Sequence, residues 1–463
     1  MARFHHGLER YEKILQLLVP SSLFAALAFP SLLFGQGSLT PPGAPAATMK
    51  TLDQVEARIP VDAAHTPGDA ANQFIINQPG SYYLTTNITG VSSKAGINIV
   101  ANDVTLDLNG FVLTGVAGAT KGIVAGSFNA SRTNIIIRHG LLRGWPGGAV
   151  DANYTYYCEL ERVNAFNCPN ATGLAVGWFG SIRHCTASGN GVSGITTGDT
   201  SLVNDSIASS NKFNGIVVGG DCVIRGCTVT YNANGPGINS FGNATISDCI
   251  ANNNTLGIQA AANTVIRDCV ANNNTSSGIY TLDECKVTGC SMLNNDMHGI
   301  QVGARGAIRD CTANFNRTNG ISGTDQCTVT GCTANANGNG VAGHGINLGV
   351  RGTVRQCIAS QNQASGIFVS GDSVVVENHA SSNGLGNGAS AAGIRTISGS
   401  SSRIEGNQVR DNAGTGILAS SSDLVFRNSS GGNTVNYSPT SGANFAPIQS
   451  LSTATNALGN FVF

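Results

Sequence analysis

The sequence has few charged and few aromatic residues for its length. Lys, Arg, Asp and Glu make up 11% of the 463 residues, and Phe, Trp and Tyr make up 6%, whereas charged residues alone are about a quarter of an ordinary globular domain. The formal net charge is −1, which excludes a nucleic-acid-binding protein that relies on bulk positive charge. No long stretch has the apolar spacing of an amphipathic helix. With 60 glycines, the composition favours an all-β chain that is rich in turns.

Long apolar runs are also missing, with one exception near the N-terminus. Ile14–Phe34 is apolar, follows three basic residues and precedes small ones, which is typical of an export signal. A membrane anchor is the competing interpretation, because about 20 apolar residues can cross a bilayer, but Pro20 and Pro30 interrupt the run. We therefore expect a cleaved signal peptide at 1–37 and a linker at 38–47. The mature protein is then secreted, periplasmic or on the cell surface, with no membrane span.

A repeat orders the rest of the chain. Within Thr264–Asn337, Cys269, Cys290, Cys311 and Cys332 follow one another at intervals of 21 residues. An aliphatic residue stands three positions before each cysteine, an Asn stands five positions after it, and a Gly-Ile pair follows each block. Self-similarity at a fixed period of about 20–50 residues indicates a solenoid.

Three columns of this repeat run far beyond the central stretch. The aliphatic column extends over fifteen coils, at Leu108, Ile137, Leu160, Ile182, Val203, Ile224, Ile246, Ile266, Val287, Ile308, Val329, Val354, Val375, Ile404 and Val425. The cysteine column contains Cys185, Cys227, Cys249, Cys269, Cys290, Cys311, Cys332 and Cys357, and it continues as Asn378, Asn407 and Asn428. The Asn column contains Asn190, Asn211, Asn232, Asn254, Asn274, Asn295, Asn316, Asn337, Asn362, Asn383, Asn412 and Asn433.

Each column has a physical interpretation. Parallel strands of successive coils stack about 4.8 Å apart, so the aliphatic column lines the core. Asn tolerates the left-handed backbone of a sharp turn, and stacked Asn amides bond one another. The Gly of each Gly-Ile pair allows the chain to bend back. We predict an all-β parallel β-helix at 97–433, a cap with a helix over Thr48–Pro60 and first strands at 48–96, and an irregular C-terminal cap or tail at 434–463.

Other repeat folds fit less well, because leucine-rich repeats need a Leu-x-x-Leu-x-Leu pattern and propeller repeats are about twice as long. Coils such as VIRDC-VANNN resemble the right-handed parallel β-helix repeat of the pectate-lyase and polygalacturonase superfamily over about Asn98–Asn433. Leu39–Pro60 is similar to a segment that precedes such helices in exported bacterial proteins of unassigned function. The resemblance implies the right-handed coil. Lyases, hydrolases, tailspikes, adhesins and metal-loading periplasmic proteins share this fold, so the fold does not determine the function.

The cysteines number 13, and eight of them share one inward column. A free Cys packs as a small hydrophobic side chain, and parallel Cβ vectors on neighbouring strands suit a disulfide poorly. We expect a ladder of reduced thiols. Disulfides and a metal site remain alternatives.

A column of arginines stands two positions before the cysteine column. It occupies every second coil, at Arg138, Arg183, Arg225, Arg267, Arg309 and Arg355. Two strand separations are roughly 10 Å, and Arg binds carboxylates or sulfates in a bidentate manner. The column therefore predicts a groove for an extended acidic polysaccharide. The competing interpretation is that the alternation only avoids repulsion between like charges, with neighbouring aspartates pairing the arginines.

Two longer loops suggest a second site. The segments Asn337–Ile346 and Asn383–Ile394 are longer than the equivalent segments of other coils, and two such loops can wall a pocket. His344 lies in the first loop within Gly-His-Gly, a motif that polygalacturonases use, and it is a catalytic candidate. The paired aspartates of those enzymes are missing, so the two-carboxylate machinery is not visible.

A lyase would need clustered acids for Ca²⁺ and a basic residue. Asp248 and Asp268 lie on adjacent coils and are metal candidates, but no third carboxylate obviously converges on them. We otherwise expect no cofactor.

Aromatic residues gather in the early coils, at Trp145, Tyr154, Tyr156, Tyr157, Phe166, Trp178 and Phe179. Exposed rings could stack on sugars, whereas buried rings would fill wider coils. We expect them to be buried.

The sequence is best interpreted as an exported protein that binds a polysaccharide or cell-surface glycan. A divergent polysaccharide lyase or glycoside hydrolase is one alternative, and a structural surface rod or adhesin is another.

Overall fold

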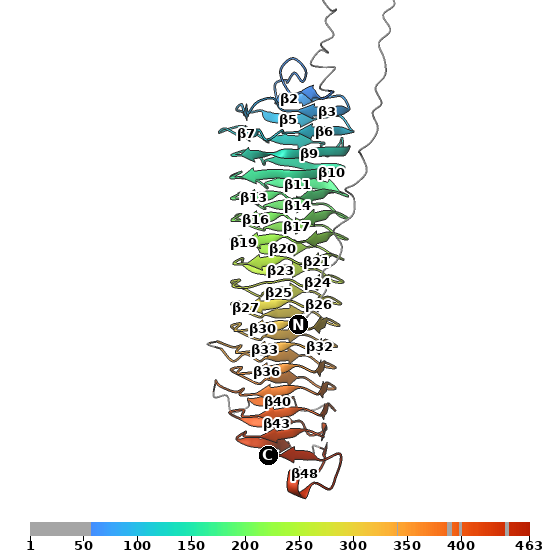
Figure 1. Ribbon diagram of the computed structural model, residues 1–463, viewed down its shortest axis with the longest axis vertical. Helices are drawn as coiled ribbons and strands as arrows, with labels where there is room; N and C mark the ends of the chain where they lie inside the picture. The colour runs from blue at the N-terminus through green and yellow to red at the C-terminus, as the bar shows by residue number, and fades with distance from the viewer. Residues whose placement is uncertain (1–56, 340, 387–390, 398–400, 440–443) are drawn as a thin grey trace, which may run out of the picture. The chain divides into compact units, whose positions relative to one another are not determined.

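The computed structural model describes residues 57–339, 341–386, 391–397, 401–439 and 444–463. These residues form a right-handed parallel β-helix of about 17 turns. Most turns contribute one short strand to each of three parallel faces, which we call faces 1, 2 and 3 (Figure 1). Strands β9 (Arg132–Arg143) and β10 (Val150–Phe166) run through more than one face, and one turn has only the bridge residue Val270 on face 2. The predicted fold class is confirmed. Of the predicted N-terminal helix, Ile59 and Pro60 instead form strand β1, and Thr48–Glu56 lies outside the described residues.

Face 1 carries the aliphatic column and the arginines. Its strands, in stacking order, are β1 (Ile59–Pro60), β3 (Gly80–Tyr83), β6 (Val104–Asp107), β9 (Arg132–Arg143), β10 (Val150–Phe166), β12 (Ser181–Arg183), β15 (Leu202–Asn204), β18 (Val223–Arg225), β21 (Thr245–Ser247), β24 (Val265–Arg267), β26 (Lys286–Thr288), β29 (Ala307–Arg309), β32 (Thr328–Thr330), β35 (Thr353–Arg355), β38 (Val374–Val376), β41 (Arg403–Glu405), β44 (Leu424–Phe426) and β47 (Asn444–Phe445).

Face 2 follows the cysteine column in each coil. Its strands are β4 (Ile88–Thr89), β7 (Val112–Thr114), the ends of β9 and β10, β13 (Thr186–Ser188), β16 (Ile207–Ser209), β19 (Thr228–Thr230), β22 (Ile250–Asn252), β27 (Ser291–Leu293), β30 (Thr312–Asn314), β33 (Thr333–Asn335), β36 (Ile358–Ser360), β39 (His379–Ser381), β42 (Gln408–Arg410), β45 (Ser429–Gly431), β49 (Asn460–Val462) and β48 (Ile448–Ser450).

Face 3 contains the Gly-Ile pairs. Its strands are β2 (Asn72–Ile76), β5 (Ala95–Ile99), β8 (Ile123–Ala125), the start of β10, β11 (Leu174–Trp178), β14 (Ile195–Thr197), β17 (Ile216–Val218), β20 (Pro236–Ser240), β23 (Leu256–Ala260), β25 (Ile279–Thr281), β28 (Ile300–Val302), β31 (Ile321–Gly323), β34 (Ile346–Leu348), β37 (Ile367–Val369), β40 (Ala392–Thr396), β43 (Thr415–Ala419) and β46 (Val435–Pro439).

The core is a continuous stack of side chains from all three faces. The aliphatic column is fully buried along face 1, as the repeat predicts. The assignment of its first member is wrong, because Leu106 rather than Leu108 lies opposite Ile137. Strand β6 therefore ends two residues earlier than the repeat suggests, and Leu108 is buried at the corner that follows.

Each corner of the coil uses one residue with a left-handed backbone. The interpretation that the Asn column supplies this residue is wrong, because the left-handed residue is the one just before it. Asn294 (φ 55°) precedes Asn295, and Phe315 (φ 56°) precedes Asn316. The left-handed backbone at that residue turns the side chain of the next residue into the core. The Asn column is therefore buried, and the residue before it points to solvent.

The buried Asn side chains form a ladder along the axis. Asn316 Oδ1 accepts the backbone N–H of Asn295 at 3.1 Å and the Nδ2 of Asn295 at 2.9 Å. Asn316 Nδ2 donates to Asn337 Oδ1 at 3.1 Å and to the carbonyl of Met292 at 3.3 Å. Every polar atom of the amide thus has a partner inside a core where an unpaired group costs about 1–3 kcal/mol.

The cysteine column uses the same geometry with sulfur as the acceptor. The backbone N–H of Cys311 points to Cys332 Sγ at 3.5 Å, and that of Cys332 points to Cys357 Sγ at 3.4 Å. The column then changes residue type without a break, because the N–H of Cys357 donates to Asn378 Oδ1 at 2.9 Å. Sulfur and amide oxygen therefore serve the same structural purpose at this corner.

The C-terminal segment extends and closes the coil. Asn460 on β49 accepts the backbone N–H of Asn428 at 3.1 Å and adds one more rung to the cysteine and Asn column. The Tyr437 hydroxyl contacts the carbonyls of Asn428 and Phe461, both at 2.9 Å. A short 3₁₀ helix, η1 (Leu451–Thr453), lies between β48 and β49.

The glycines of the Gly-Ile pairs are required for close approach. A Cβ at Gly299 would lie 2.6 Å from the carbonyl oxygen of Gly320 and 2.7 Å from Asn316 Nδ2. Neither atom can move without breaking the ladder, and the backbone of Gly299 is not left-handed. These glycines are therefore needed because a side chain would collide with the next coil. The expectation that they allow the chain to bend is wrong.

We predict that Gly299→Ala lowers the free energy of unfolding by about 1–3 kcal/mol, the usual effect of overpacking a core. Gly220→Ala is the matched control, since a Cβ there meets only Asp199 Oδ1 at 4.0 Å. Urea denaturation of both variants measures the difference, and an equal effect of the two substitutions would contradict the steric explanation.

The buried thiols lead to a second prediction. All 13 cysteines are buried and free, and burial raises the pKa of the Cys185 thiol to about 12. Because all 13 thiols are buried and out of reach of the reagent, we expect iodoacetamide to label none of them in the folded protein at mildly alkaline pH and all of them in denaturant. Intact-mass spectrometry counts the adducts. Rapid labelling of the folded protein would show that the cysteine column is accessible.

Candidate functional site

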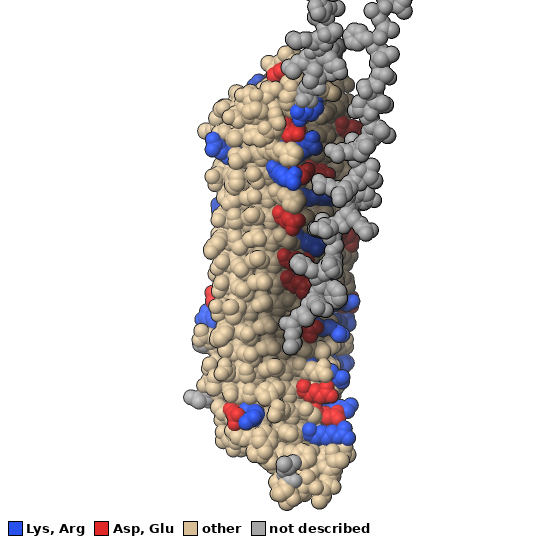
Figure 2. Space-filling view, in the orientation of Figure 1, with Lys and Arg blue, Asp and Glu red and all other residues tan. Residues whose placement is uncertain are grey.

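Charged side chains are concentrated on one part of the surface. Figure 2 shows Lys, Arg, Asp and Glu in a band along the long axis, whereas most of the remaining visible surface carries no charge. Many of these charges belong to face 1 and to the corner that follows it, because the arginine column lies there. The band is therefore the first candidate for recognition of a ligand.

The arginine column forms a row in register on face 1. The strand pairs that establish it are Arg138↔Glu161, Glu161↔Arg183, Arg183↔Asn204, Asn204↔Arg225, Arg225↔Ser247, Ser247↔Arg267, Arg267↔Thr288, Thr288↔Arg309, Arg309↔Thr330 and Thr330↔Arg355. An arginine therefore recurs on every second strand, about 10 Å apart. Five of the six side chains are exposed, and Arg138 is half-buried.

The arginines differ in their partners. Arg138 Nε is 3.1 Å from the buried carboxylate of Asp107, and Arg225 Nε is 3.4 Å from Asp248. Among the described residues, the guanidinium groups of Arg267, Arg309 and Arg355 have no hydrogen-bond or ion-pair partner. Half of the row is therefore available to a ligand.

The aspartates beside the row have their own packing arrangement. Asp268 and Asp310 are left-handed corner residues, with φ of 54° and 51°. Their Oδ1 atoms lie 2.5 and 2.4 Å from the positions that a Cβ would take on Gly289 and Gly331 in the next coil. The side chains of Asp268 and Asp310 thus need a Gly at the equivalent corner of the next coil, whereas Asp248 is followed there by Asp268. This packing explains why the Arg-Asp pairs at 267–268 and 309–310 are each followed by Thr-Gly in the next coil, without an ion pair to Asp268 or Asp310.

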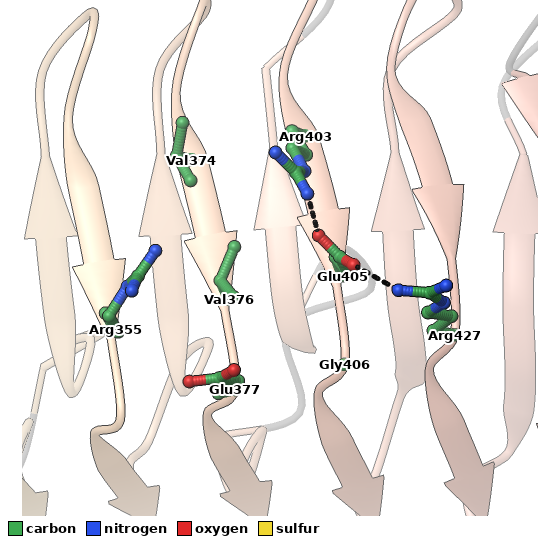
Figure 3. A pocket seen from close by; sticks show the side chains of 8 residues that line it. All are labelled: Arg355, Val374, Val376, Glu377, Arg403, Glu405, Gly406 and Arg427. Carbon is green, nitrogen blue, oxygen red and sulfur yellow. Dashed lines mark hydrogen bonds and ion pairs between the residues drawn. The ribbon is translucent and has the colours of Figure 1, made fainter. Parts of the chain in front are cut away.

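A pocket opens where the row ends. It has a volume of about 360 Å³ and is lined by Arg355, Val374, Val376, Glu377, Arg403, Glu405, Gly406 and Arg427. Figure 3 shows these residues on the successive strands β35, β38, β41 and β44 of face 1, or directly after them. The two valines form an apolar surface between Arg355 and Arg403.

One carboxylate holds two of the pocket arginines. Glu405 is paired with Arg403 and lies 3.3 Å from Arg427, and its side chain is only 13% exposed (Figure 3). Glu377 accepts a hydrogen bond from Gln356 Nε2 at 3.1 Å. Three arginines and two glutamates leave a net positive charge in the pocket. The repeat did not reveal Arg403 and Arg427, because they lie outside the arginine column. Glu405 lies in that column, two strands after Arg355, where the alternation would place the next arginine.

His344 is placed away from this pocket. Its ring stacks on Phe368, with centroids 4.6 Å apart, and its Nδ1 accepts the backbone N–H of Ser365 at 3.2 Å. Burial, together with the nearby Arg395 cation, lowers the pKa of His344 to about 4. The ring is therefore neutral at physiological pH and packs as part of the wall of face 3. A catalytic role for His344 stays a prediction.

The two metal candidates lie on adjacent corners. Asp248 forms an ion pair with Arg225, and Asp268 packs against Gly289 of the next coil. In the part of the chain that the structure describes, no three His, Cys, Asp or Glu side chains gather into a group that could hold a metal ion.

Most of the early aromatic side chains are exposed, so the expectation of a buried cluster is wrong. Trp145 is fully buried, but Tyr154, Tyr156, Tyr157, Trp178 and Phe179 are 36–57% exposed. Tyr157 (φ 58°) and Phe179 (φ 55°) are left-handed corner residues, whose side chains point outward. Phe166 is half-buried. Spacing in the sequence did not distinguish these corners from core positions.

The comparison with protein families agrees with the architecture. Residues 214–348 and 339–438 match the family described as right handed beta helix region. No curated protein matches the sequence. Within the described residues, no helix has the length and apolar character that crossing a membrane requires.

Several solved structures are similar to this chain at low identity. The A-module of the mannuronan C-5 epimerase AlgE4 from Azotobacter vinelandii is 14% identical, with a TM-score of 0.37 over 65% of this chain and 86% of that chain. A tailspike protein of the E. coli bacteriophage HK620, solved with a hexasaccharide, is 14% identical, with a TM-score of 0.43 over 76% and 73%. The periplasmic alginate epimerase AlgG is 12% identical, with a TM-score of 0.32 over 79% and 81%. At these identities and TM-scores, the similarities carry no argument about what this chain binds.

The neutral His344 predicts a pH dependence of stability. The pKa of His344 is lowered from 6.5 to about 4 in the folded state, so the unfolded chain binds more protons between these values. The free energy of unfolding should fall by about 2–3 kcal/mol as the pH drops from 6.5 to about 4. His344→Gln should make this dependence shallower in urea denaturation, whereas the exposed His184→Gln should not. The same slope in His344→Gln and the parent protein would contradict the prediction.

Proposed function

We propose that this right-handed parallel β-helix protein binds an extended acidic polysaccharide along face 1, outside the cytoplasmic membrane. The observation that carries the proposal is the row of exposed arginines on every second strand. The row leads into the pocket around Arg355. The export-like segment Ile14–Phe34 supports a location where such polymers occur.

The geometry of the row favours a polymer over a small anion. Guanidinium groups recur about 10 Å apart along a straight, rigid support, and the distance from Arg225 to Arg355 covers six strand steps. A chain of sugar acids presents carboxylates or sulfates at comparable intervals. Several weak, solvent-exposed contacts in register then add up because one polysaccharide chain makes all of them.

The spacing of the arginines in the row argues against nucleic acid as the ligand. Double-stranded DNA carries one charge per about 1.7 Å of its axis, which is far denser than the arginines. The corner aspartates Asp268 and Asp310, which are next to the arginines, would repel such a dense polyanion. A polymer with widely spaced charges can place its neutral hydroxyl groups beside these aspartates.

The pocket at the end of the row has the features of a sugar subsite. The half-buried Val374 offers an apolar surface for the C–H face of a pyranose ring, and the guanidinium of Arg355 has no partner among the described residues. Glu405 holds Arg403 and Arg427 in place, so these two groups lose less conformational freedom when they bind a ligand. An acidic sugar residue fits this arrangement of charge.

The proposal is tested with Arg267→Ser, Arg309→Ser and Arg355→Ser combined. We expect the affinity for polygalacturonate or alginate to fall at least about tenfold, because three charge-assisted contacts are lost. Binding by the parent protein should weaken as salt increases, since exposed charges are screened. Cosedimentation and calorimetry measure both effects.

The matched control changes three exposed cations on other parts of the surface, Arg143, Lys212 and Arg317, to Ser. It has the same net charge as the test variant, so retained binding would separate the row from bulk charge. Equal loss in the two variants would contradict the assignment of the row. If the parent protein binds neither polymer, the protein is better explained as a structural rod or adhesin.

A further inference from the structure

A second hollow lies at the corner between faces 2 and 3, away from the arginine row. It has a volume of about 420 Å³, and its lining includes Phe315, Asn339, Gln361, Gln363 and Leu385. We propose that this corner pocket binds a neutral sugar unit. The proposal rests on residues that the acidic-polysaccharide site does not use, so either can fail without the other.

Each of the two long loops contributes a described residue to the lining of the corner pocket. Asn339 comes from the first loop and Leu385 from the second, which confirms the prediction that these loops wall a pocket. Both loops are attached to the coil between them: the N–H of Ala364 donates to the Gly343 carbonyl, and the N–H of Gly386 donates to the Gln363 carbonyl, both at 2.9 Å. His344 and Arg395 do not line the pocket.

The floor consists of the corner position of four consecutive coils. Phe315, Ala336, Gln361 and Ser382 are all left-handed, with φ between 54° and 57°, and such residues point their side chains outward. Large and small side chains alternate along the axis. Because Ala336 carries only a methyl group, the space between Phe315 and Gln361 is left open. Phe315 is 56% exposed beside that space.

The polar groups of the corner pocket are uncharged amides. The side chains of Asn339, Gln361 and Gln363 have no hydrogen-bond partner among the described residues. Each amide offers two donors and one acceptor, a combination that matches neighbouring hydroxyl groups. Among the described residues that line the pocket there is no Lys, Arg, Asp, Glu or His. A charged ligand would gain no ionic contact here.

These features together specify the class of ligand. An exposed aromatic ring attracts a flat apolar surface, and nearby amides bind hydroxyl groups in the plane of that surface. A pyranose ring has both an apolar C–H face and a rim of hydroxyl groups. The pocket volume lies within the range of small-molecule sites. A neutral sugar unit of an oligosaccharide or glycan chain therefore fits the corner pocket.

The full chain can be tested by calorimetry and saturation-transfer NMR with four neutral probes: cellotetraose, maltotetraose, laminaritetraose and mannotetraose. We expect at least one probe to bind and Phe315→Ala to weaken its affinity about tenfold. The combined Gln361→Ala and Gln363→Ala variant should also weaken binding. The affinity for a neutral probe should not change with salt, in contrast to binding at the arginine row.

Tyr231→Ala is the matched control, because Tyr231 occupies the same corner position four coils earlier, is left-handed (φ 59°) and is 63% exposed. It should bind the probe as the parent protein does. Thermal unfolding of each variant verifies that the fold is intact. The proposal is overturned if no probe binds at millimolar concentration, if Phe315→Ala binds as tightly as the parent protein, or if Tyr231→Ala loses as much affinity.

Discussion

Hydrogen bonding along the axis inside the core is the constraint on which the rest of the structure depends. A coil of three short strands has three sharp corners, and each corner leaves backbone N–H groups that no strand can pair. The Asn column accepts these groups at one corner, and the cysteine column, continued by Asn378, accepts them at another. The coils must therefore stay in register, because a shift of one residue would leave buried amides unpaired.

This constraint also arranges the surface. The left-handed residue before each buried rung points outward, so corner positions such as Asp268, Phe315 and Gln361 are free to vary in chemistry. Exact stacking then turns any residue type that recurs in the repeat into a line on the surface. The arginine row and the corner pocket are two results of this rule, one with alternating charge and one with alternating size.

The repeat was sufficient to predict the fold class, the buried columns, the arginine row and the loop-walled pocket, because a solenoid converts sequence period directly into spatial neighbours. The repeat gave wrong predictions where its period alone does not fix the ends of the strands. Leu106 replaces Leu108 in the aliphatic column, and Tyr157 and Phe179 are exposed rather than buried. In both cases the difference depends on where a strand ends and a corner begins, which apolar residues do not mark.

The sequence by itself determined which residues share a column, because equivalent positions must stack when every coil has about the same length. Only the tertiary structure decided which groups meet across columns. Arg403 and Arg427 line one pocket with Arg355, although they lie outside its column, because β35, β38, β41 and β44 stack in register. Likewise, the amides of Gln361 and Gln363 face a pocket because two distant loops are attached to one coil by backbone hydrogen bonds.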